Sequence, residues 1–456
     1  MGKLIEDVKQ LIYMKKGIED QLQLIDHLQQ LGVAYHFKED IKDALGTIYE
    51  GNLKASLCHQ TEGLVSLYEA SHLAKEGEHA LEEATNFTTK QLKSLMEGSL
   101  EPHLREHVAH ALELPLNWRM PRLQTRWFIE ASQWEAKMNP VLLELAKLDF
   151  NRVQIIYQRE LREVSRWWSN LGLAQRLPFS RDRLMENYFW TVGWAFEPQF
   201  ARIREAQTKA NCLITTIDDV YDVYGTIDEL ELFTDAVDRW DVNTIDKLPE
   251  YMKICFLALF NSTNDTAYNV MKEKGLDIIP HLKKAWADLC KAYMVEARWY
   301  HQGYTPILKS TWERTSIDIG SLILTLAYCT SDDLTQEALD DFQSCPEIAR
   351  WASMVFRLCD DLGTSTRCIQ IYPVLRMRPC IGGRGSWAYR GLIKGNWRAI
   401  NGNRSFTSPF EENLKMMAIN IARMAQCIYQ YGDGYGKPDG VIEDRIRSLL
   451  IEPILM

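Results

Sequence analysis

Residues 213–226 read Leu-Ile-Thr-Thr-Ile-Asp-Asp-Val-Tyr-Asp-Val-Tyr-Gly-Thr, and they place three carboxylates on a segment that is otherwise largely apolar. At 100° per residue, Asp218 and Asp222 project from one face of a helix, with Asp219 about a quarter of a turn away. Like charges at this i, i+4 spacing destabilise a helix by a few tenths of a kcal/mol. Burial of these carboxylates beside the preceding apolar residues would cost much more unless a partner neutralises them.

Two interpretations of this acidic segment follow from its residues. The first is a solvent-exposed acidic face of a helix. The apolar flanks favour the second, in which a hard divalent cation neutralises the carboxylates, because carboxylate oxygen is the ligand that Mg²⁺ prefers. The segment therefore predicts a buried site for Mg²⁺ and a diphosphate.

The composition is that of an ordinary globular protein, with 46% apolar and 25% charged residues in a chain of 456. This length suits two or three domains. The net charge of −10 argues against non-specific binding to nucleic acid. The sequence contains no run of about 18 apolar residues, so no membrane span is predicted. The ten cysteines are scattered and form no C-x-x-C pair, which predicts reduced thiols. The first residues resemble no signal or transit sequence. Both observations predict a cytoplasmic location.

Helical periodicity dominates the chain, and the alternating patterns of strands are nearly absent. The sequence therefore predicts an all-α protein. A boundary is expected near 165, because residues 1–165 contain no catalytic constellation and residues 166–456 hold every candidate. The clearest predicted helices cover residues 18–31, 141–161, 183–199, 203–224, 276–299, 316–328, 345–358 and 414–431.

Asp360 and Asp361 form a second candidate acidic site, because they follow an apolar helix. Thr364 lies four residues after Asp360 on the same helical face, where its hydroxyl can add a metal ligand. Position 368 would continue this row of ligands around the helix. Its residue is Cys368, a soft ligand that is poorly suited to Mg²⁺.

Three arginines accompany the two acidic segments. Arg181 and Arg183 stand just before a predicted helix, and Arg357 precedes Asp360 by three residues. Guanidinium groups suit diphosphate recognition, although a single arginine is more often a surface or ion-pair residue. The helix that follows Arg183 carries five aromatic residues, among them Trp190. These predict either a core or the wall of a pocket that stabilises a carbocation.

One segment differs in composition from the rest of this acidic chain. Residues 362–410 contain eight Arg or Lys and no acidic residue. Within them, residues 369–389 lose helical periodicity and contain prolines and a glycine cluster.

Four motifs in order along the chain resemble those of plant class I terpene synthases, and most of all their monoterpene synthase branch. The similarity covers nearly the whole chain, including residues 63–71. The motifs are Leu-Pro-Phe-Ser-Arg-Asp-Arg (177–183), Asp-Asp-Val-Tyr-Asp-Val-Tyr-Gly-Thr (218–226), Arg-Leu-Cys-Asp-Asp-Leu-Gly-Thr-Ser (357–365), and a C-terminal pair, Arg-Met-Ala-Gln and Tyr-Gly-Asp-Gly (423–434).

The resemblance implies an N-terminal α-barrel-like domain and a C-terminal domain with the class I terpene synthase (isoprenoid synthase) fold. It implies that the loop at residues 429–436 closes the site against water. It also implies roles for the candidate residues: metal binding by Asp218, Asp219, Asp222, Asp360 and Thr364, diphosphate binding by Arg181 and Arg357 with Arg183 beside them, and a cation pocket lined by Trp190.

The chemistry that the resemblance implies is the conversion of geranyl diphosphate to monoterpene hydrocarbons. Three Mg²⁺ ions, or Mn²⁺ in their place, would assist ionisation of the diphosphate, and cyclisation and proton loss would follow. The alternatives are a sesquiterpene synthase acting on farnesyl diphosphate and a non-catalytic relic. A chain-elongating prenyltransferase is disfavoured, because its second motif would be another aspartate pentad. The expected protein is a monomer or weak homodimer without nucleic-acid or membrane partners, and it is plastidic if a transit peptide lies outside this chain.

Three departures from the family pattern bear on activity. A tandem-arginine segment usual near the N-terminus is absent. Residues 48–54 join segments between which the family has further helices, which predicts an internal deletion near residue 50. Cys368 stands where the family has Glu, and a one-base shift of codons for residues 369–376 can restore a family-like Ser-Lys-Ser-Ile-Gln-Cys-Tyr. We therefore hypothesise that residues 367–389 are translated out of frame.

Overall fold

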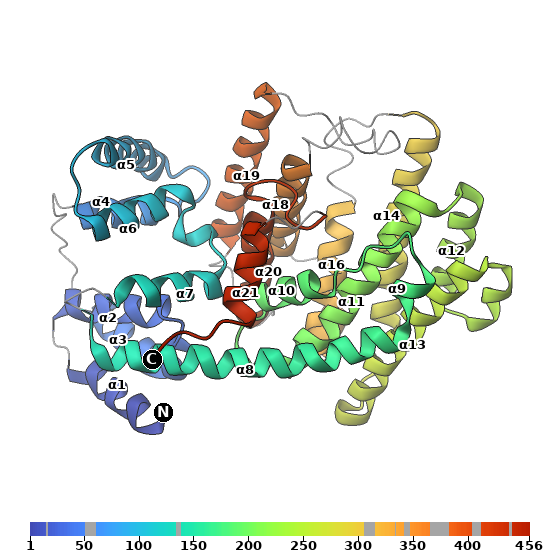
Figure 1. Cartoon of the computed structure of the whole chain (residues 1–456), viewed down its shortest axis with the longest axis horizontal. Coiled ribbons are helices and arrows are strands. Elements are labelled where there is room, and N and C mark those ends of the chain that lie inside the picture. The colour runs from blue at the N-terminus through green and yellow to red at the C-terminus, as the bar shows by residue number, and fades with distance from the viewer. Residues whose placement is uncertain are drawn as a thin grey trace. The chain divides into compact units, whose positions relative to one another are not determined.

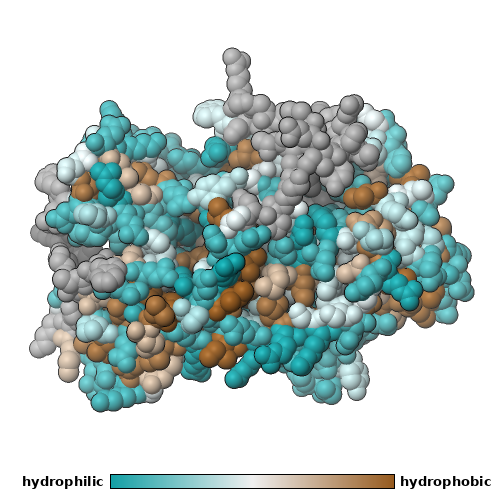
Figure 2. All heavy atoms as spheres, in the orientation of Figure 1, coloured by the Kyte–Doolittle hydropathy of each residue, from teal (hydrophilic) through white to brown (hydrophobic). Residues whose placement is uncertain are grey.

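The computed structural model describes residues 1–14, 17–50, 61–133, 138–304, 315–332, 334–341, 347–364, 383–403, 412–436 and 440–456. Every regular element in these ranges is a helix, as Figure 1 shows. The all-α prediction is therefore confirmed for the described part of the chain. No helix among the described residues is long and apolar enough to cross a membrane. On the face drawn in Figure 2, hydrophilic and hydrophobic residues are interspersed.

Contacts divide the chain into two compact units. Unit 1 comprises Met1–Gln158 and Glu443–Met456, and unit 2 comprises Arg159–Ile442. The first boundary falls after Gln158, whereas the sequence predicts one near 165. The main difference from the expected two domains is that the last residues, Glu443–Met456, belong to unit 1. The Asn151 side chain exchanges two hydrogen bonds of 2.8 Å with the backbone of Ile454.

Unit 1 is built from short amphipathic helices and part of one long helix. Its core contains fully buried apolar side chains such as Leu28, Leu92 and Phe150. The helices are α1 (Gly2–Met14), α2 (Ile18–Gln30), α3 (Lys38–Glu50), α4 (Thr61–Ser71), α5 (His79–Glu97), α6 (Pro102–Glu113), α7 (Pro121–Ser132), the first part of α8 (Pro140–Leu171), and most of α21 (Gly440–Leu450).

A partly buried carboxylate of unit 1, that of Glu69, makes the stability of this unit depend on pH. The side chain of Glu69 accepts a hydrogen bond of 2.7 Å from the backbone N–H of Leu116. Burial raises the pKa of Glu69 to about 7; the hydrogen bond and the charge of Arg119 oppose this shift, and the charge of Asp26 adds to it. The folded chain therefore retains a proton on Glu69 at pH values where the unfolded chain has lost it. Stability conferred at this site is lost as the pH rises from about 4.5 to about 7.

Replacement of Glu69 by Gln is expected to raise the free energy of unfolding at pH 8 by on the order of 1 to 3 kcal/mol. The amide keeps an acceptor for Leu116 and removes the buried charge. The gain should shrink towards zero near pH 4.5, as urea unfolding at both pH values would measure. Glu62→Gln, at an exposed position of the same helix, is the matched control. A gain that is equal at both pH values would contradict the prediction.

Unit 2 is a bundle in which α18 packs against α16, α19 and α20, and α10 packs against α11 and α20. Its helices are the rest of α8, α9 (Leu173–Arg176), α10 (Leu184–Trp194), α11 (Ala201–Asp219), α12 (Ile227–Arg239), α13 (Glu250–Lys274), α14 (Ile279–His301), α16 (Thr315–Cys329), α17 (Gln336–Asp341), α18 (Glu347–Thr364), α19 (Gly383–Asn403) and α20 (Glu412–Tyr429).

Helical periodicity is lost in the sequence over residues 369–389, but α19 already begins at Gly383 within that range. Apolar side chains recur at helical spacing from Tyr389 onward, and Tyr389, Ile393 and Trp397 are all buried. Packing of this stripe extends the helix across glycines that the sequence pattern disfavours. Residues 365–382 lie outside the described part of the chain.

One buried ion pair fixes the end of α10 in unit 2. The fully buried guanidinium of Arg204 donates two hydrogen bonds of 2.7 Å to the carboxylate of Glu160. Its Nη1 donates to the carbonyls of Ala195 and Glu197, at 2.7 and 2.6 Å. These carbonyls follow the last turn of α10, where backbone carbonyls have no acceptor role within the helix.

Candidate active site

The acidic segment begins on α11 and continues into a single π-helical turn, Val220–Tyr224. The N–H of Gly225 closes this turn with a 2.8 Å hydrogen bond to the carbonyl of Val220. Such wide turns are rare and often occur at functional sites. The sequence pattern here is that of a regular α-helix and does not predict the π turn. Asp218 and Asp222 nevertheless face the same cavity, as their spacing predicts.

That cavity has a volume of about 350 Å³ and lies within unit 2. Elements far apart in the sequence contribute to its wall, from Phe179 to Gly436. The predicted site residues that line it are Arg181, Trp190, Asp218, Asp219, Asp222, Arg357, Asp360 and Thr364. The structure therefore brings together eight of the nine predicted residues.

Arg181 bridges the first two aspartates of the acidic segment. Its Nη2 donates to Asp218 at 2.7 Å, and its Nε donates to Asp219 at 2.8 Å. Burial lowers the pKa of Arg181, but the charges of Asp218 and Asp219 raise it above its ordinary value, so the guanidinium stays charged. Burial raises the pKa of Asp219, and the charge of Arg181 opposes that shift.

The opposite wall is the C-terminal end of α18. Asp360 and Thr364 both line the cavity, and the Thr364 hydroxyl donates to the carbonyl of Asp360 at 2.7 Å. The Nε of Arg357 lies 3.0 Å from the Asp361 carboxylate, and its Nη1 lies 3.8 Å from Glu296. Cys368, which would follow on this wall, lies outside the described residues.

The donors on the two walls fit Mg²⁺. Among the described residues, no three His, Cys, Asp or Glu side chains converge on one point. Mg²⁺ does not need such a cage, because it keeps several water ligands and is usually held by one or two carboxylates together with substrate phosphates. Asp218 and Asp222 on one wall, with Asp360 and Thr364 on the other, supply only the hard oxygen donors that this ion prefers.

An aromatic wall lies in the same cavity. The ring of Trp190 contacts Phe356 edge-on, with 5.3 Å between the centroids, and lies 6.5 Å from the ring of Tyr429. The aromatic stripe of α10 is thus divided, because Trp190 faces the cavity and Tyr188 and Phe189 are fully buried. Rings in this arrangement can stabilise a cation through their faces.

Arg183 does not line the cavity with Arg181. Its Nε donates to the carbonyl of Tyr435 at 3.1 Å, and its Nη2 donates to that of Gly436 at 2.9 Å. Arg183 therefore holds the 429–436 segment by its backbone. The sequence could not reveal this contact, because it joins residues about 250 positions apart.

Polar residues of the cavity that were not predicted include Asn187, Thr215 and Glu296, and Tyr435 was expected only as part of the segment at residues 429–436. The Tyr435 hydroxyl lies 2.5 Å from that of Thr215 and donates to Asn187 at 2.9 Å. Burial raises the pKa of Tyr435 above its ordinary value, so the hydroxyl stays protonated. Asn187 and Thr215 carry no motif in the sequence, and only the Gly-Asp-Gly-Tyr-Gly stretch gave a signal for Tyr435.

Close packing of α16 against α18 shapes one side of this cavity. A Cβ at Gly320 would lie 1.7 Å from the Ser353 hydroxyl oxygen and 2.9 Å from its Cβ. Both residues line the cavity. The two helices can approach this closely only with glycine at position 320.

Replacement of Gly320 by Ala is therefore expected to lower the free energy of unfolding by about 1 to 3 kcal/mol. Ser353→Gly in the same chain should recover most of that loss, as denaturant unfolding would measure. Gly391→Ala on α19 is the matched control, because its Cβ would meet no atom within 4 Å, and it should leave stability equal or slightly higher. Equal effects of Gly320→Ala with and without Ser353→Gly would contradict the prediction.

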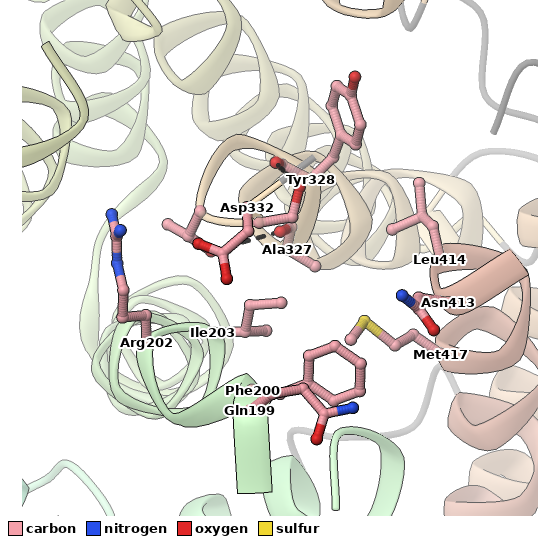
Figure 3. A pocket seen from close by; sticks show the side chains of 12 residues that line it. Gln199, Phe200, Arg202, Ile203, Ala327, Tyr328, Asp332, Asn413, Leu414 and Met417 are labelled. Carbon is pink, nitrogen blue, oxygen red and sulfur yellow. Dashed lines mark hydrogen bonds between the residues drawn. The ribbon is translucent and has the colours of Figure 1, made fainter. Parts of the chain in front are cut away.

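A second cavity, of about 230 Å³, lies between α11, α16 and α20 (Figure 3). Its lining includes Phe200, Ile203, Met417 and one carboxylate, Asp332. Arg202 on its rim is 2.5 Å from Glu273. It contains none of the predicted site residues, and a single carboxylate does not make a metal site.

Residues 169–370 match the family described as "Terpene synthase family, metal binding domain". Residues 1–54 and 49–112 match "Terpene synthase, N-terminal domain". Monoterpene synthase 8, chloroplastic, from Hedychium coronarium is 51% identical over 511 positions, which cover 99% of this chain and 86% of that protein.

Two solved structures are similar over the whole chain. Isoprene synthase from grey poplar (Populus x canescens), in complex with three Mg²⁺ ions and dimethylallyl-S-thiolodiphosphate, is 39% identical, with a TM-score of 0.92 and 96% of its own chain covered. Limonene synthase with 2-fluorolinalyl diphosphate is 38% identical, with a TM-score of 0.92 and 94% of its chain covered. The predicted fold class is therefore confirmed.

Proposed function

The chain belongs to the terpene synthase family, and from this premise we propose that it converts geranyl diphosphate to monoterpene hydrocarbons. The observation that carries the proposal is the cavity of about 350 Å³ in unit 2. It combines the oxygen donors of Asp218, Asp222 and Asp360, the charged Arg181 and Arg357, and an aromatic wall. Ionisation of an allylic diphosphate needs the carboxylates and the arginines. Protection of the resulting cation needs the aromatic wall.

The residues of the two acidic walls would hold Mg²⁺, which when bound supplies Lewis-acid stabilisation of the departing diphosphate. Three ions are proposed, because the isoprene synthase structure contains three. Arg181 and Arg357 would bind diphosphate oxygens, since guanidinium donors match that geometry. Trp190, Phe356 and Tyr429 would exclude water and stabilise positive charge during cyclisation, before proton loss ends the reaction.

A ten-carbon substrate is supported by the relatives. The Hedychium protein is named a monoterpene synthase, and the limonene synthase structure contains a linalyl diphosphate analogue. The word chloroplastic in the Hedychium name supports a plastid location for this protein as well. No described residue tests the oligomeric state, so a monomer or weak homodimer stays a prediction.

A second candidate is a protein that keeps the fold without the activity. The match to the metal-binding domain ends at residue 370, two residues after Cys368 and close to the start of the segment hypothesised to be out of frame. The alignment to the Hedychium relative spans 511 positions, although this chain has 456 residues. More than 50 residues of that relative thus have no counterpart here. The N-terminal match breaks at residues 49–54, which supports the proposed deletion near residue 50.

Incubation of the purified chain with geranyl or farnesyl diphosphate and Mg²⁺, followed by gas chromatography of the headspace, tests the proposal. Monoterpenes from geranyl diphosphate are the expected result. Products from farnesyl diphosphate alone would identify a sesquiterpene synthase. Absence of product from both, with activity restored by Cys368→Glu and a family-like sequence at 367–389, would identify the relic.

A further inference from the structure

We propose that the second cavity of unit 2, of about 230 Å³, is a binding site for a small uncharged alcohol with an apolar body. Among the described residues, none lines both this cavity and the main one. The helices α11, α16 and α20 line the second cavity near one end and the main cavity farther along. The inference therefore concerns a separate site and does not depend on the proposed function.

One side of the second cavity is apolar. Ile203 from α11, Ala327 from α16, and Leu414 and Met417 from α20 line it, and all four side chains are buried. Phe200, which precedes α11, completes this side, as Figure 3 shows. Water against such a wall lacks the polar partners that hold an ordered water molecule. Displacement of this water by an apolar group is favourable, so the wall suits the body of an apolar ligand.

The volume of the cavity limits the size of this ligand. Protein interiors contain few voids larger than a water molecule, so a cavity of about 230 Å³ is unusual. An apolar cavity of about 150 Å³ is large enough to bind benzene. In proportion, the second cavity would hold about nine or ten non-hydrogen atoms. This is the size of one ring with a short substituent, and it is smaller than a prenyl diphosphate.

Two polar side chains offer hydrogen bonds to such a ligand. In Figure 3, the carboxylate of Asp332 and the amide of Asn413 lie on opposite sides of the cavity, with Ile203 and Met417 between them. The ionised carboxylate can only accept a hydrogen bond, whereas the amide can donate or accept one. A hydroxyl group is both a donor and an acceptor, so an alcohol can bind to either side chain.

The charges around the cavity balance, which favours an uncharged ligand. Arg202 on the rim pairs with Glu273 at 2.5 Å. Lys274 donates to the backbone carbonyl of Ser331 at 2.9 Å and to that of Asp332. The two cationic side chains thus accompany the carboxylates of Glu273 and Asp332, and these four groups leave no net charge to attract an ion.

Methyl NMR of the full chain tests binding directly. Isoleucine and methionine methyl groups are isotopically labelled, and α-terpineol, a cyclic alcohol of the expected size, is titrated without Mg²⁺ or diphosphate. The signals of Ile203 and Met417 should shift, whereas that of Met416, which does not line the cavity, should stay unchanged. Shifts confined to Ile214 and Ile421, which line the main cavity, would overturn the inference. So would the absence of any shift up to the solubility limit.

Occlusion of the cavity provides a second test. Met417→Trp should abolish the shift of Ile203, because the larger side chain replaces one that extends into the cavity (Figure 3). Met416→Trp is the matched control, since it makes the same change one residue earlier on α20, at a position that is 37% exposed. Circular dichroism verifies the fold of both variants, and the wild-type titration decides the question if Met417→Trp does not fold. A full response of Ile203 in Met417→Trp would overturn the inference.

Two further ligands test the chemical class. Limonene, which has a similar ring and no hydroxyl, should bind several-fold more weakly than α-terpineol, because it leaves Asp332 and Asn413 without a hydrogen bond. Asp332→Ala should reduce this preference and leave limonene binding unchanged. Bornylamine, a protonated amine of similar size, should bind no more tightly than α-terpineol. Equal affinities for limonene and α-terpineol, or tighter binding of the amine, would overturn the assignment to an uncharged alcohol. These measurements involve no catalysis, so a failure of the proposed reaction would leave their outcome unaffected.

Discussion

Replacement of Asp218 by Asn is expected to lower monoterpene formation by at least about 100-fold. Residues that merely orient a metal ligand contribute 10- to 100-fold to activity or affinity, so loss of a direct carboxylate ligand should exceed that range. The side chain faces the cavity from the last turn of α11, and the change removes a negative charge without changing its size. The expected loss appears in product yield and in the Mg²⁺ concentration needed for half-maximal rate, both measured by gas chromatography.

Asp235→Asn is the matched control for this change. Asp235 forms an exposed ion pair with Arg239 on the neighbouring helix α12, and such pairs contribute at most about 1 kcal/mol. The control should leave product yield and Mg²⁺ dependence unchanged. An Asp218→Asn enzyme that keeps more than a tenth of the wild-type yield would argue against a direct metal ligand at this position.

The acidic site could be predicted because burial of carboxylates has few solutions. Asp218 and Asp222 fall on one helical face at their spacing, and their apolar neighbours favour a site with a neutralising partner over an exposed acidic face. The family prediction from four motifs is confirmed. The role of Arg183 and the presence of Glu296 in the cavity could not be predicted, because both depend on contacts between distant segments.

The helices could be predicted to the extent that their apolar periodicity is unbroken. The stripes on α11, α14 and α20 gave the right elements, with ends that differ by a few residues. Periodicity failed at the start of α19, where glycines precede the buried stripe. It also gave no sign of the π turn at Val220–Tyr224, because a wider turn requires no special residue.

Replacement of Arg204 by Met is expected to lower the free energy of unfolding by about 3 to 5 kcal/mol. The change leaves the carboxylate of Glu160 without its cationic partner in a site where Arg204 itself is fully buried. It also removes the donors to the carbonyls of Ala195 and Glu197 at the end of α10. Because α10 carries Trp190, the aromatic wall of the cavity should also loosen. Urea unfolding, followed by circular dichroism and by tryptophan fluorescence, measures both effects.

The chain provides a closely matched control two residues earlier on the same helix. Arg202 is paired with Glu273 at 2.5 Å, but both side chains are 44% exposed. Arg202→Met removes the same group from the same helix, and it should cost less than about 1 kcal/mol because water screens the pair. The difference between the two variants isolates burial as the cause. Comparable losses of unfolding free energy from Arg202→Met and Arg204→Met would instead show that removal of either arginine destabilises α11 itself. The ion pair with Glu160 would then contribute nothing specific to the end of α10.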